Sequence, residues 1–342
     1  VAALAGVSQS AVSRVFTPGA SVSRKTADKV REAAETLGYR PNVLARAMIT
    51  GRSRIIGLVV AYLDNQFYPV AIERLSRLLQ TQGYHLLVFM ADNDARRTAR
   101  VVDEILDYQV DGIVAASVSV GNDLAARCEA AGIPIVLFNR GGDEAAPRAL
   151  SDNHGEVTSD NRAGGRAVAR FLLAGGHRRV AHVSGWQGSS TGRDRRLGLE
   201  EGLAQDCHDP AAVIDGLYRR EVAASAARDL MEAPSPPDAI FVGNDHMAFG
   251  VLDCLRFEMG LRVPGDVSVV GYDDVPIAAW AAYDLTTVRQ PVERMVQATV
   301  AALLARIEGR GNVGVTRIPG PLVVRGSART NEPRTPPPSE EP

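Results

Sequence analysis

The sequence predicts an α/β protein, in which a small helical headpiece precedes two subdomains built on doubly wound parallel sheets. In the first 40 residues, short helical stretches are separated by tight turns. From Arg54 onward, apolar runs rich in β-branched residues alternate with amphipathic stretches, a pattern typical of parallel sheets covered on both faces. This alternation occurs in two sets, and 342 residues suffice for two ordinary domains plus a small module.

Capping residues and glycines divide the headpiece into short helices. Ser8 and Ser23 are placed as N-caps, while Gly6 and Gly38 follow apolar stretches that they can end. We therefore expect helices over residues 1–5, 9–16 and 24–37. Two short helices joined by a turn, with a third packed behind them, are typical of a helix-turn-helix.

The core is expected to contain two sets of strands. The first set covers residues 55–61, 86–90, 112–116 and 134–138, and the second covers 180–184, 213–216, 239–242 and 267–271. Helices are expected between them, over 70–82, 97–108, 124–131, 164–174 and 246–259. Further strand-like pieces at 285–289 and 322–325 follow a complete second set, so we expect the chain to cross back between the subdomains.

These patterns predict the following division of the chain. A headpiece with a truncated start covers residues 1–41, and a linker covers 42–52. The first core subdomain combines 53–153 with 285–317, the second combines 154–284 with 318–330, and the Pro- and Glu-rich tail over 331–342 is disordered.

Charge is distributed unevenly along the chain. Residues 1–52 contain eight Lys or Arg against three acidic residues, a net charge of +5, whereas the remainder carries −7. A basic head on an acidic body favours a polyanion partner for the head alone. On charge alone, a solvated helical surface is an equal alternative.

Several classes of protein are disfavoured by what the sequence lacks. Three cysteines lie far apart without CxxC spacing, which indicates neither a disulfide framework nor a zinc site. The chain has no apolar run of 18 residues and no signal segment, so we expect a cytoplasmic protein without a membrane partner. The six histidines show no i, i+4 pairing, and we expect no metal or other cofactor.

Enzyme motifs are also missing. Both lysines, Lys25 and Lys29, lie in the headpiece, so the α/β core has no P-loop lysine. No GxGxxG follows a strand, and HExxH is absent. Asp273 and Asp274 are adjacent at a strand end, where neighbouring side chains point in opposite directions. We therefore expect no catalytic site.

Motifs in both parts of the chain resemble those of the LacI/GalR transcription regulators, over residues 1 to about 330. The motifs are Val1–Val15, Val22-Ser23, Leu37–Asn42, Ile56-Gly57, Asp111–Ile113, Gly176–Arg179, Asn244-Asp245, Ser268–Asp274 and Leu285–Gln290. The resemblance implies a DNA-binding headpiece, a hinge helix and a core like the periplasmic sugar-binding proteins. It also implies a homodimer that binds a palindromic operator as a repressor and is controlled by a small effector.

Residue roles in DNA binding follow from that resemblance. Early residues of the second helix, Gln9, Ser10 and Arg14, are expected to read bases, because Gln pairs with adenine and Arg with guanine. Ser8, Ser13, Ser23 and Lys25 are expected to contact phosphates or cap helices. The hinge residues Asn42, Ala45 and Met48 are expected at the minor groove, where Met48 replaces the usual Leu as the wedge between bases.

The effector is expected between the subdomains, beyond the carboxyl ends of the strands. The residues that match the family there are Phe67, Tyr68, Asn139, Arg140, Arg195, Tyr218, Asn244 and Asp273. Asn244 and Asp273 are alternatively turn formers, and the three aromatic residues are alternatively packing residues.

The effector is expected to be a sugar or sugar derivative. Arg140, Arg193, Arg195 and Arg196 favour an acidic sugar such as a uronate or aldonate, although arginine replaces lysine throughout the core. Two other classes remain open, a solute-binding protein without DNA function and an enzyme on the same core. The tail lacks a leucine heptad, so we expect no tetramer.

Overall fold

The computed structural model of the chain describes residues 1–17, 19–40, 51–91, 95–117, 127–128, 130–141, 154–310 and 314–330. It divides into two compact units, Val1–Arg54 and Ile55–Pro342. Residues 42–50 of the linker, residues 124–126 and 129 of the helix expected over 124–131, and all of the tail over 331–342 lie outside the described residues. Within the described part of the chain, no helix is long and apolar enough to cross a membrane.

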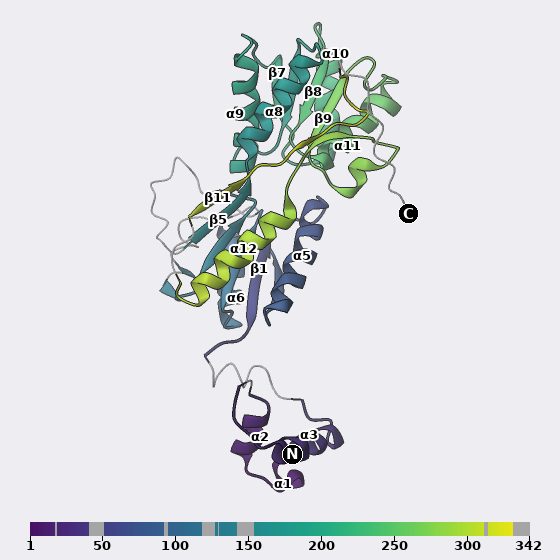
Figure 1. Cartoon of the computed structure of the whole chain (residues 1–342). Helices are drawn as coiled ribbons and strands as arrows, with labels where there is room; N and C mark the ends of the chain where they lie inside the picture. The colour runs from purple at the N-terminus through teal and green to yellow at the C-terminus, as the bar shows by residue number, and fades with distance from the viewer. Residues whose placement is uncertain are drawn as a thin grey trace. The chain divides into compact units, whose positions relative to one another are not determined.

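The headpiece folds into the predicted helices (Figure 1), which are α1 (Ala2–Ala5), α2 (Gln9–Val15) and α3 (Arg24–Thr36). The hydroxyls of Ser8 and Ser23 cap α2 and α3, each accepting a hydrogen bond of 3.2 Å from the backbone N–H three residues on. Gly6 ends α1 in the left-handed conformation, with φ 64°.

A small apolar core holds these helices together. Val30 of α3 is fully buried beside Ala5 and Ala33, and Val12 and Phe16 pack against them from α2. The predicted helix-turn-helix is therefore confirmed.

The described part of the core contains two six-stranded sheets with the same order. The first, β11-β5-β4-β3-β1-β2, contains β1 (Ile55–Val60), β2 (His85–Met90), β3 (Gly112–Ala116), β4 (Ile135–Phe138), β5 (His154–Ser159) and β11 (Val315–Ile318). The second, β12-β10-β9-β8-β6-β7, contains β6 (Val180–Ser184), β7 (Ala212–Asp215), β8 (Ala239–Val242), β9 (Ser268–Asp273), β10 (Thr286–Arg289) and β12 (Leu322–Val323). Neighbouring strands are parallel, except that β12 is antiparallel to β10.

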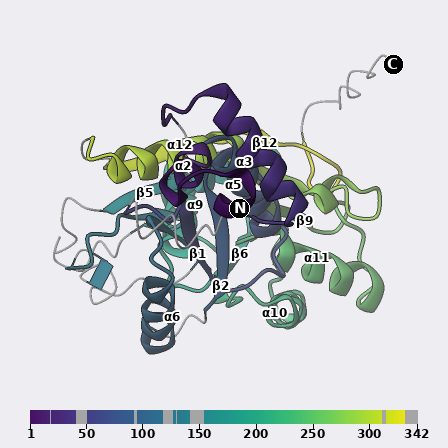
Figure 2. The same ribbon diagram turned by 90° about the horizontal axis from the view of Figure 1, so that it is seen from below.

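Helices cover both faces of each sheet, which accounts for the nearly continuous apolar strands. On the first sheet, α5 (Phe67–Thr81) and α12 (Val292–Ile307) pack on the face that contains Leu58, and α6 (Ala95–Asp107) packs on the face that contains Val59. Figure 2 shows α12 and α6 on opposite sides of β1. The helices of the second subdomain are α8 (Asn161–Ala174), α9 (Ser190–Ala204), α10 (Arg220–Glu232) and α11 (Asp245–Asp253).

The predicted division of the core is wrong at two strands. Residues 154–159 were expected in the second subdomain, but β5 pairs with β4 and β11 in the first sheet. Its polar sequence, His-Gly-Glu-Val-Thr-Ser, gives no apolar strand signal. Residues 285–289 were expected in the first subdomain, but β10 pairs with β9 in the second sheet. The chain therefore crosses between the sheets after β5, after β10 and after β11.

Close contact between α8 and α9 positions part of the site described below. Gly165 of α8 lies against the backbone of α9, and Gly198 of α9 lies against the carbonyl oxygen of Arg162 in α8. A Cβ atom at Gly198 would overlap that oxygen. The two helices are therefore closer together at this point than a residue with a side chain would permit.

We predict that Gly198→Ala destabilises the protein by about 1–3 kcal/mol, although alanine favours helices, because the added methyl group must separate α8 from α9. Denaturant unfolding measures the change. Gly314→Ala is the control, because a Cβ there meets no atom within 4 Å, and we expect a change within about 0.5 kcal/mol. If the two variants were equally stable, the close packing of α8 against α9 at Gly198 would be contradicted.

Candidate functional site

The exposed face of α2 carries the residues predicted to read bases. Gln9, Ser10, Ser13 and Arg14 are all exposed, as are Ser23 and Lys25 at the start of α3. The hydroxyl of Ser8 caps α2 and also contacts the Ser10 hydroxyl at 2.9 Å. The hinge residues Asn42, Ala45 and Met48 lie outside the described residues.

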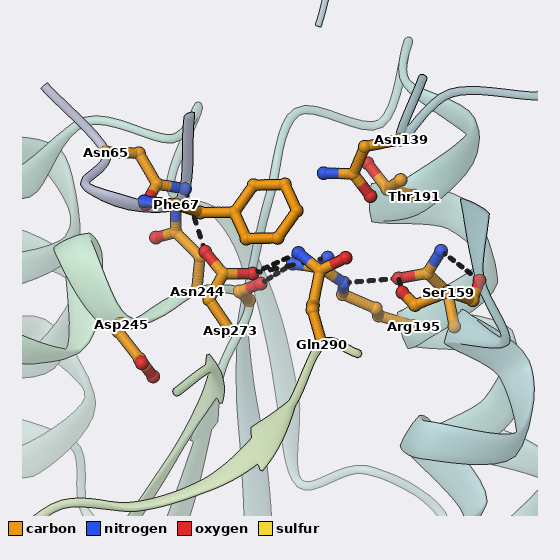
Figure 3. A network of polar contacts seen from close by, with 12 residues as sticks. Asn65, Phe67, Asn139, Ser159, Thr191, Arg195, Asn244, Asp245, Asp273 and Gln290 are labelled. Carbon is orange, nitrogen blue, oxygen red and sulfur yellow. Dashed lines mark hydrogen bonds and ion pairs between the residues drawn. The ribbon is translucent and has the colours of Figure 1, made fainter. Parts of the chain in front are cut away.

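The second candidate site lies where the carboxyl ends of the strands of both sheets meet. Its centre is Asp273, the last residue of β9. Asp273 is 3% exposed. Asn65, which follows β1 in the other subdomain, donates to Asp273 Oδ2 at 2.8 Å, and Gln290, after β10, donates to Oδ1 at 2.7 Å. Figure 3 shows these side chains converging on the carboxylate. The network thus joins the two subdomains.

Arg195 of α9 supplies the positive charge beside this carboxylate. Its Nη2 lies 3.6 Å from Asp273 Oδ1, and its guanidinium lies 3.7 Å from the ring centroid of Tyr272. Its Nε donates to Asn161 Oδ1 at 2.8 Å, and Nη1 donates to the Gly243 carbonyl at 2.5 Å. The residue is 2% exposed, and its side chain is held between α8 and β8 by these hydrogen bonds.

The backbone directs Asp273 and Asp274 to different partners, as the sequence predicts. Both residues have positive φ, 128° for Asp273 and 57° for Asp274, a conformation that non-glycine residues rarely adopt. Asp274 forms ion pairs with Arg289 at 2.6 Å and Arg325 at 2.7 Å, within the second subdomain. The two carboxylates therefore do not form one centre.

Asn244 is both a helix cap and a member of the site. Its Oδ1 accepts a hydrogen bond of 2.9 Å from the Met247 N–H at the start of α11. Its Nδ2 is buried without a hydrogen-bond partner in the structure, as are Asn139 Oδ1 and Gln290 Oε1. Three side chains of this region, from both subdomains, thus leave a polar atom unpaired among the described residues.

Aromatic side chains surround these polar groups. Phe67 stacks on Phe138 with ring centroids 6.1 Å apart, and the Tyr68 hydroxyl accepts a hydrogen bond of 3.2 Å from Asn139. Tyr218 lies over Gly185, where a Cβ would overlap its ring. Its hydroxyl is 3.1 Å from Thr191 Oγ1.

Arg140 completes the predicted set. It follows β4, is 5% exposed, and donates to Thr191 Oγ1 at 2.7 Å. Its guanidinium is 6.0 Å from the ring centroid of Tyr218. The structure therefore brings all eight predicted residues to one region.

Other residues of this region were not identified from the sequence. The most important are Asn65 and Gln290, which hold the central carboxylate, with Tyr62, Ser117, Asn161 and Thr191 around them. Each lies just after a strand or at a helix start, so polar residues at strand ends are the signal that could have found them.

Described residues also line two cavities that contain none of the eight predicted residues. One, of about 180 Å³, adjoins the network at Asn65 and is lined from the second subdomain by His246, Phe249, Trp280 and Tyr283, among others. The other, of about 820 Å³, is open and lies near Gly176 and Arg256. The chemistry of the buried network, rather than cavity size, identifies the candidate site.

Comparison with known proteins decides the family. Residues 1–42 match the model of bacterial regulatory proteins of the lacI family, and residues 169–328 match a periplasmic binding protein-like domain. The HTH-type transcriptional repressor PurR of Vibrio atlanticus is 30% identical over 91% of both chains. The chain belongs to the LacI family. Both the resemblance and the fold class predicted from the sequence are confirmed.

Solved structures of LacI family members agree over nearly the whole chain. The lac repressor dimer bound to operator and the anti-inducer ONPF has a TM-score of 0.84 and 27% identity, covering 96% of this chain and 98% of its own. The complex of the regulator CelR with cellobiose has a TM-score of 0.73 and 30% identity, with the same coverage.

A second buried carboxylate lies close to the centre of the site. Asp245, fully buried at the start of α11, accepts hydrogen bonds from Thr287 Oγ1 at 2.6 Å and from the Val275 N–H at 3.0 Å. Burial, and then the charge of Asp273, raise the pKa of Asp245 to about 7, and burial also raises the pKa of Asp273.

This raised pKa predicts a pH-dependent difference between the wild type and Asp245→Asn. The native state holds a proton that the unfolded state releases near pH 4, so the Asp245 contribution to stability falls as pH rises from about 4 to about 7. Asparagine does not titrate, so from pH 5 to pH 8 the variant should gain roughly 1–3 kcal/mol relative to the wild type. Denaturant unfolding at both pH values measures this, and a constant difference would contradict it.

Proposed function

We propose that this LacI family member is an effector-controlled transcriptional repressor that acts in the cytoplasm as a homodimer on a palindromic operator. It acts by binding and not by catalysis. The observation that carries the proposal is the combination in one chain of a basic helix-turn-helix and a core whose subdomains share one buried polar network. The likeness to the operator-bound lac repressor dimer supports the dimer and the DNA partner.

The headpiece presents the chemistry that base reading requires. Gln9, Ser10 and Arg14 are exposed on α2, which is long enough to lie in a major groove. Ser13 and Lys25 contact phosphates, while Ser8 and Ser23 already act as caps. A two-fold operator is read by two headpieces, whose hinge residues Asn42, Ala45 and Met48 occupy the minor groove, as the family resemblance implies.

The effector is a sugar or a sugar derivative bound between the subdomains. The unpaired atoms are two acceptors, Asn139 Oδ1 and Gln290 Oε1, and one donor, Asn244 Nδ2. Hydroxyl groups both donate and accept, so a polyhydroxylated ligand satisfies all three. The ring of Tyr218 offers a face for its apolar side. The CelR complex with cellobiose shows that a related core can hold a sugar.

Control of DNA binding follows from ligand contacts to both subdomains. A ligand that binds one arrangement of the subdomains more tightly shifts the population toward it, and with it the spacing of the paired hinges. Such coupling is typically worth about 1–3 kcal/mol and is equal in both directions. A solute-binding protein without DNA function is the alternative, and operator binding separates the two.

We predict that Arg14→Ala weakens operator binding by about 1–3 kcal/mol and relaxes preference at one base pair per half-site. Duplexes selected from a random pool, and then a base-substitution panel, provide the measurement. The control is Arg24→Ala, at the first residue of α3. As a phosphate contact, it should weaken all sequences alike and lower the salt slope by about one. Identical behaviour of the two variants would contradict base reading by Arg14.

For the effector site, we predict that Asp273→Asn weakens effector binding at least tenfold, about 1.4 kcal/mol, because it removes the charge and one acceptor of the central network. A thermal-shift screen of sugars, sugar acids and nucleobases first identifies the effector, because a ligand of the native state raises its apparent stability. Titration calorimetry then compares the variants. Asp274→Asn should keep wild-type affinity, since Asp274 pairs with Arg289 and Arg325 instead. Wild-type affinity in Asp273→Asn would make Asp273 a turn former only.

A further inference from the structure

The four arginines near the effector site have different surroundings. Arg193 donates to the Gln187 carbonyl at 3.3 Å, and Arg196 pairs with Glu200 at 2.7 Å on the partly exposed side of α9. Arg140 and Arg195 instead are 5% and 2% exposed, inside the site. Of the four, the two buried arginines are therefore the ones placed to determine the charge of a ligand.

The charges of these two buried arginines are balanced differently. Arg195 has the Asp273 carboxylate 3.6 Å away. Arg140 has uncharged partners among the described residues: Nη1 donates to Thr191 Oγ1 at 2.7 Å, and Nη2 is 3.4 Å from both the carbonyl and the hydroxyl oxygen of Ser117. A buried guanidinium without a counter-charge is unfavourable, because neutral dipoles replace its hydration only in part.

The start of α9 adds positive potential at Arg140, although the buried carboxylate of Glu156 lies beside the next residue, Gly141. Thr191 belongs to the first turn of the 15-residue helix α9, so the guanidinium lies beside the positive end of a helix dipole. Tyr62 and Tyr68 are two of the phenol hydroxyl groups near Arg140. Burial raises the pKa of both, so they remain neutral and supply no counter-charge. The direct contacts of Arg140 occupy at most three of its five N–H groups, which leaves donors for a further acceptor.

We propose that the effector carries an anionic group, a carboxylate or a phosphate attached to a sugar, which pairs with Arg140. The proposal rests on the effector site described under the proposed function and specifies the chemistry of its ligand. Asp273, Asn244 and Gln290 contact the hydroxyl groups of that ligand. The anionic group lies at the opposite side of the site, between Arg140 and the start of α9.

The first test needs no ligand. Arg140→Met removes a charge that has no counter-charge, and Thr191 keeps the Tyr218 hydroxyl at 3.1 Å as a hydrogen-bond partner. We expect this variant to melt no lower than the wild type at low salt. Arg195→Met is the matched comparison, because it leaves the Asp273 carboxylate buried without its cation, and it should melt several degrees lower. If Arg140→Met loses as much as Arg195→Met, the charge of Arg140 is already balanced and the proposal is wrong.

The second test measures anion binding by the full-length protein. Inorganic phosphate or acetate, compared with chloride at equal ionic strength, should raise the melting temperature of the wild type more than that of Arg140→Met. In calorimetry, glucuronate or gluconate should bind at least ten times more tightly than glucose if the group is a carboxylate. If it is a phosphate, glucose 6-phosphate should show that preference instead. Arg140→Met should abolish either preference.

The outcomes separate this proposal from the proposed function. Equal affinity for neutral and anionic sugars, a preference that survives in Arg140→Met, or equal anion effects in both proteins would each overturn it. A neutral sugar that binds in the site and changes operator affinity would leave the proposed function intact and exclude the anionic effector. Arg140-dependent binding of an anionic sugar without any change in operator affinity would support the anion site and contradict the regulatory function.

Discussion

The arrangement of the two subdomains depends on how the buried carboxylate of Asp273 is hydrogen-bonded. Its donors come from the first subdomain through Asn65 and from a crossover segment through Gln290, and Arg195 balances its charge. Separation of the subdomains would break the Asn65 contact and leave a buried acceptor with fewer partners, which is unfavourable. A ligand that contacts the same groups therefore acts on the equilibrium between subdomain arrangements, and not on one subdomain alone.

Features set by short-range chemistry could be predicted from the sequence. Ser8 and Ser23 cap helices because the hydroxyl of each accepts a hydrogen bond from the backbone N–H three residues later. This contact does not depend on what surrounds the helix. Gly6 takes positive φ after α1 for an equally local reason. The apolar strands of both sheets were found because strands covered on both faces have few polar residues.

Features set by distant partners could not be predicted. β5 is a polar segment that becomes a strand because β4 and β11 lie on either side of it, so its sequence carries no signal of burial. β10 was recognised as a strand, but it was placed in the wrong sheet because it follows a second set of strands that looked complete. Asn65 contacts Asp273 across 208 residues, and a lone Asn after a strand is equally compatible with a turn. Family motifs indicated which residues gather at the site, but not their hydrogen-bond partners.

The two buried arginines show what the structure adds to composition. In the sequence, Arg140 and Arg195 are two of many arginines in a core without lysine, and their number says little about ligand charge. The structure distinguishes them by their partners, a carboxylate for Arg195 and neutral oxygens for Arg140. Specificity is a difference between binding free energies. A neutral ligand leaves the charge of Arg140 unbalanced in both the free and the bound protein, whereas an anionic group balances it only on binding. The difference between the two ligands is therefore concentrated at one side chain, while the hydroxyl contacts around Asp273 are common to both.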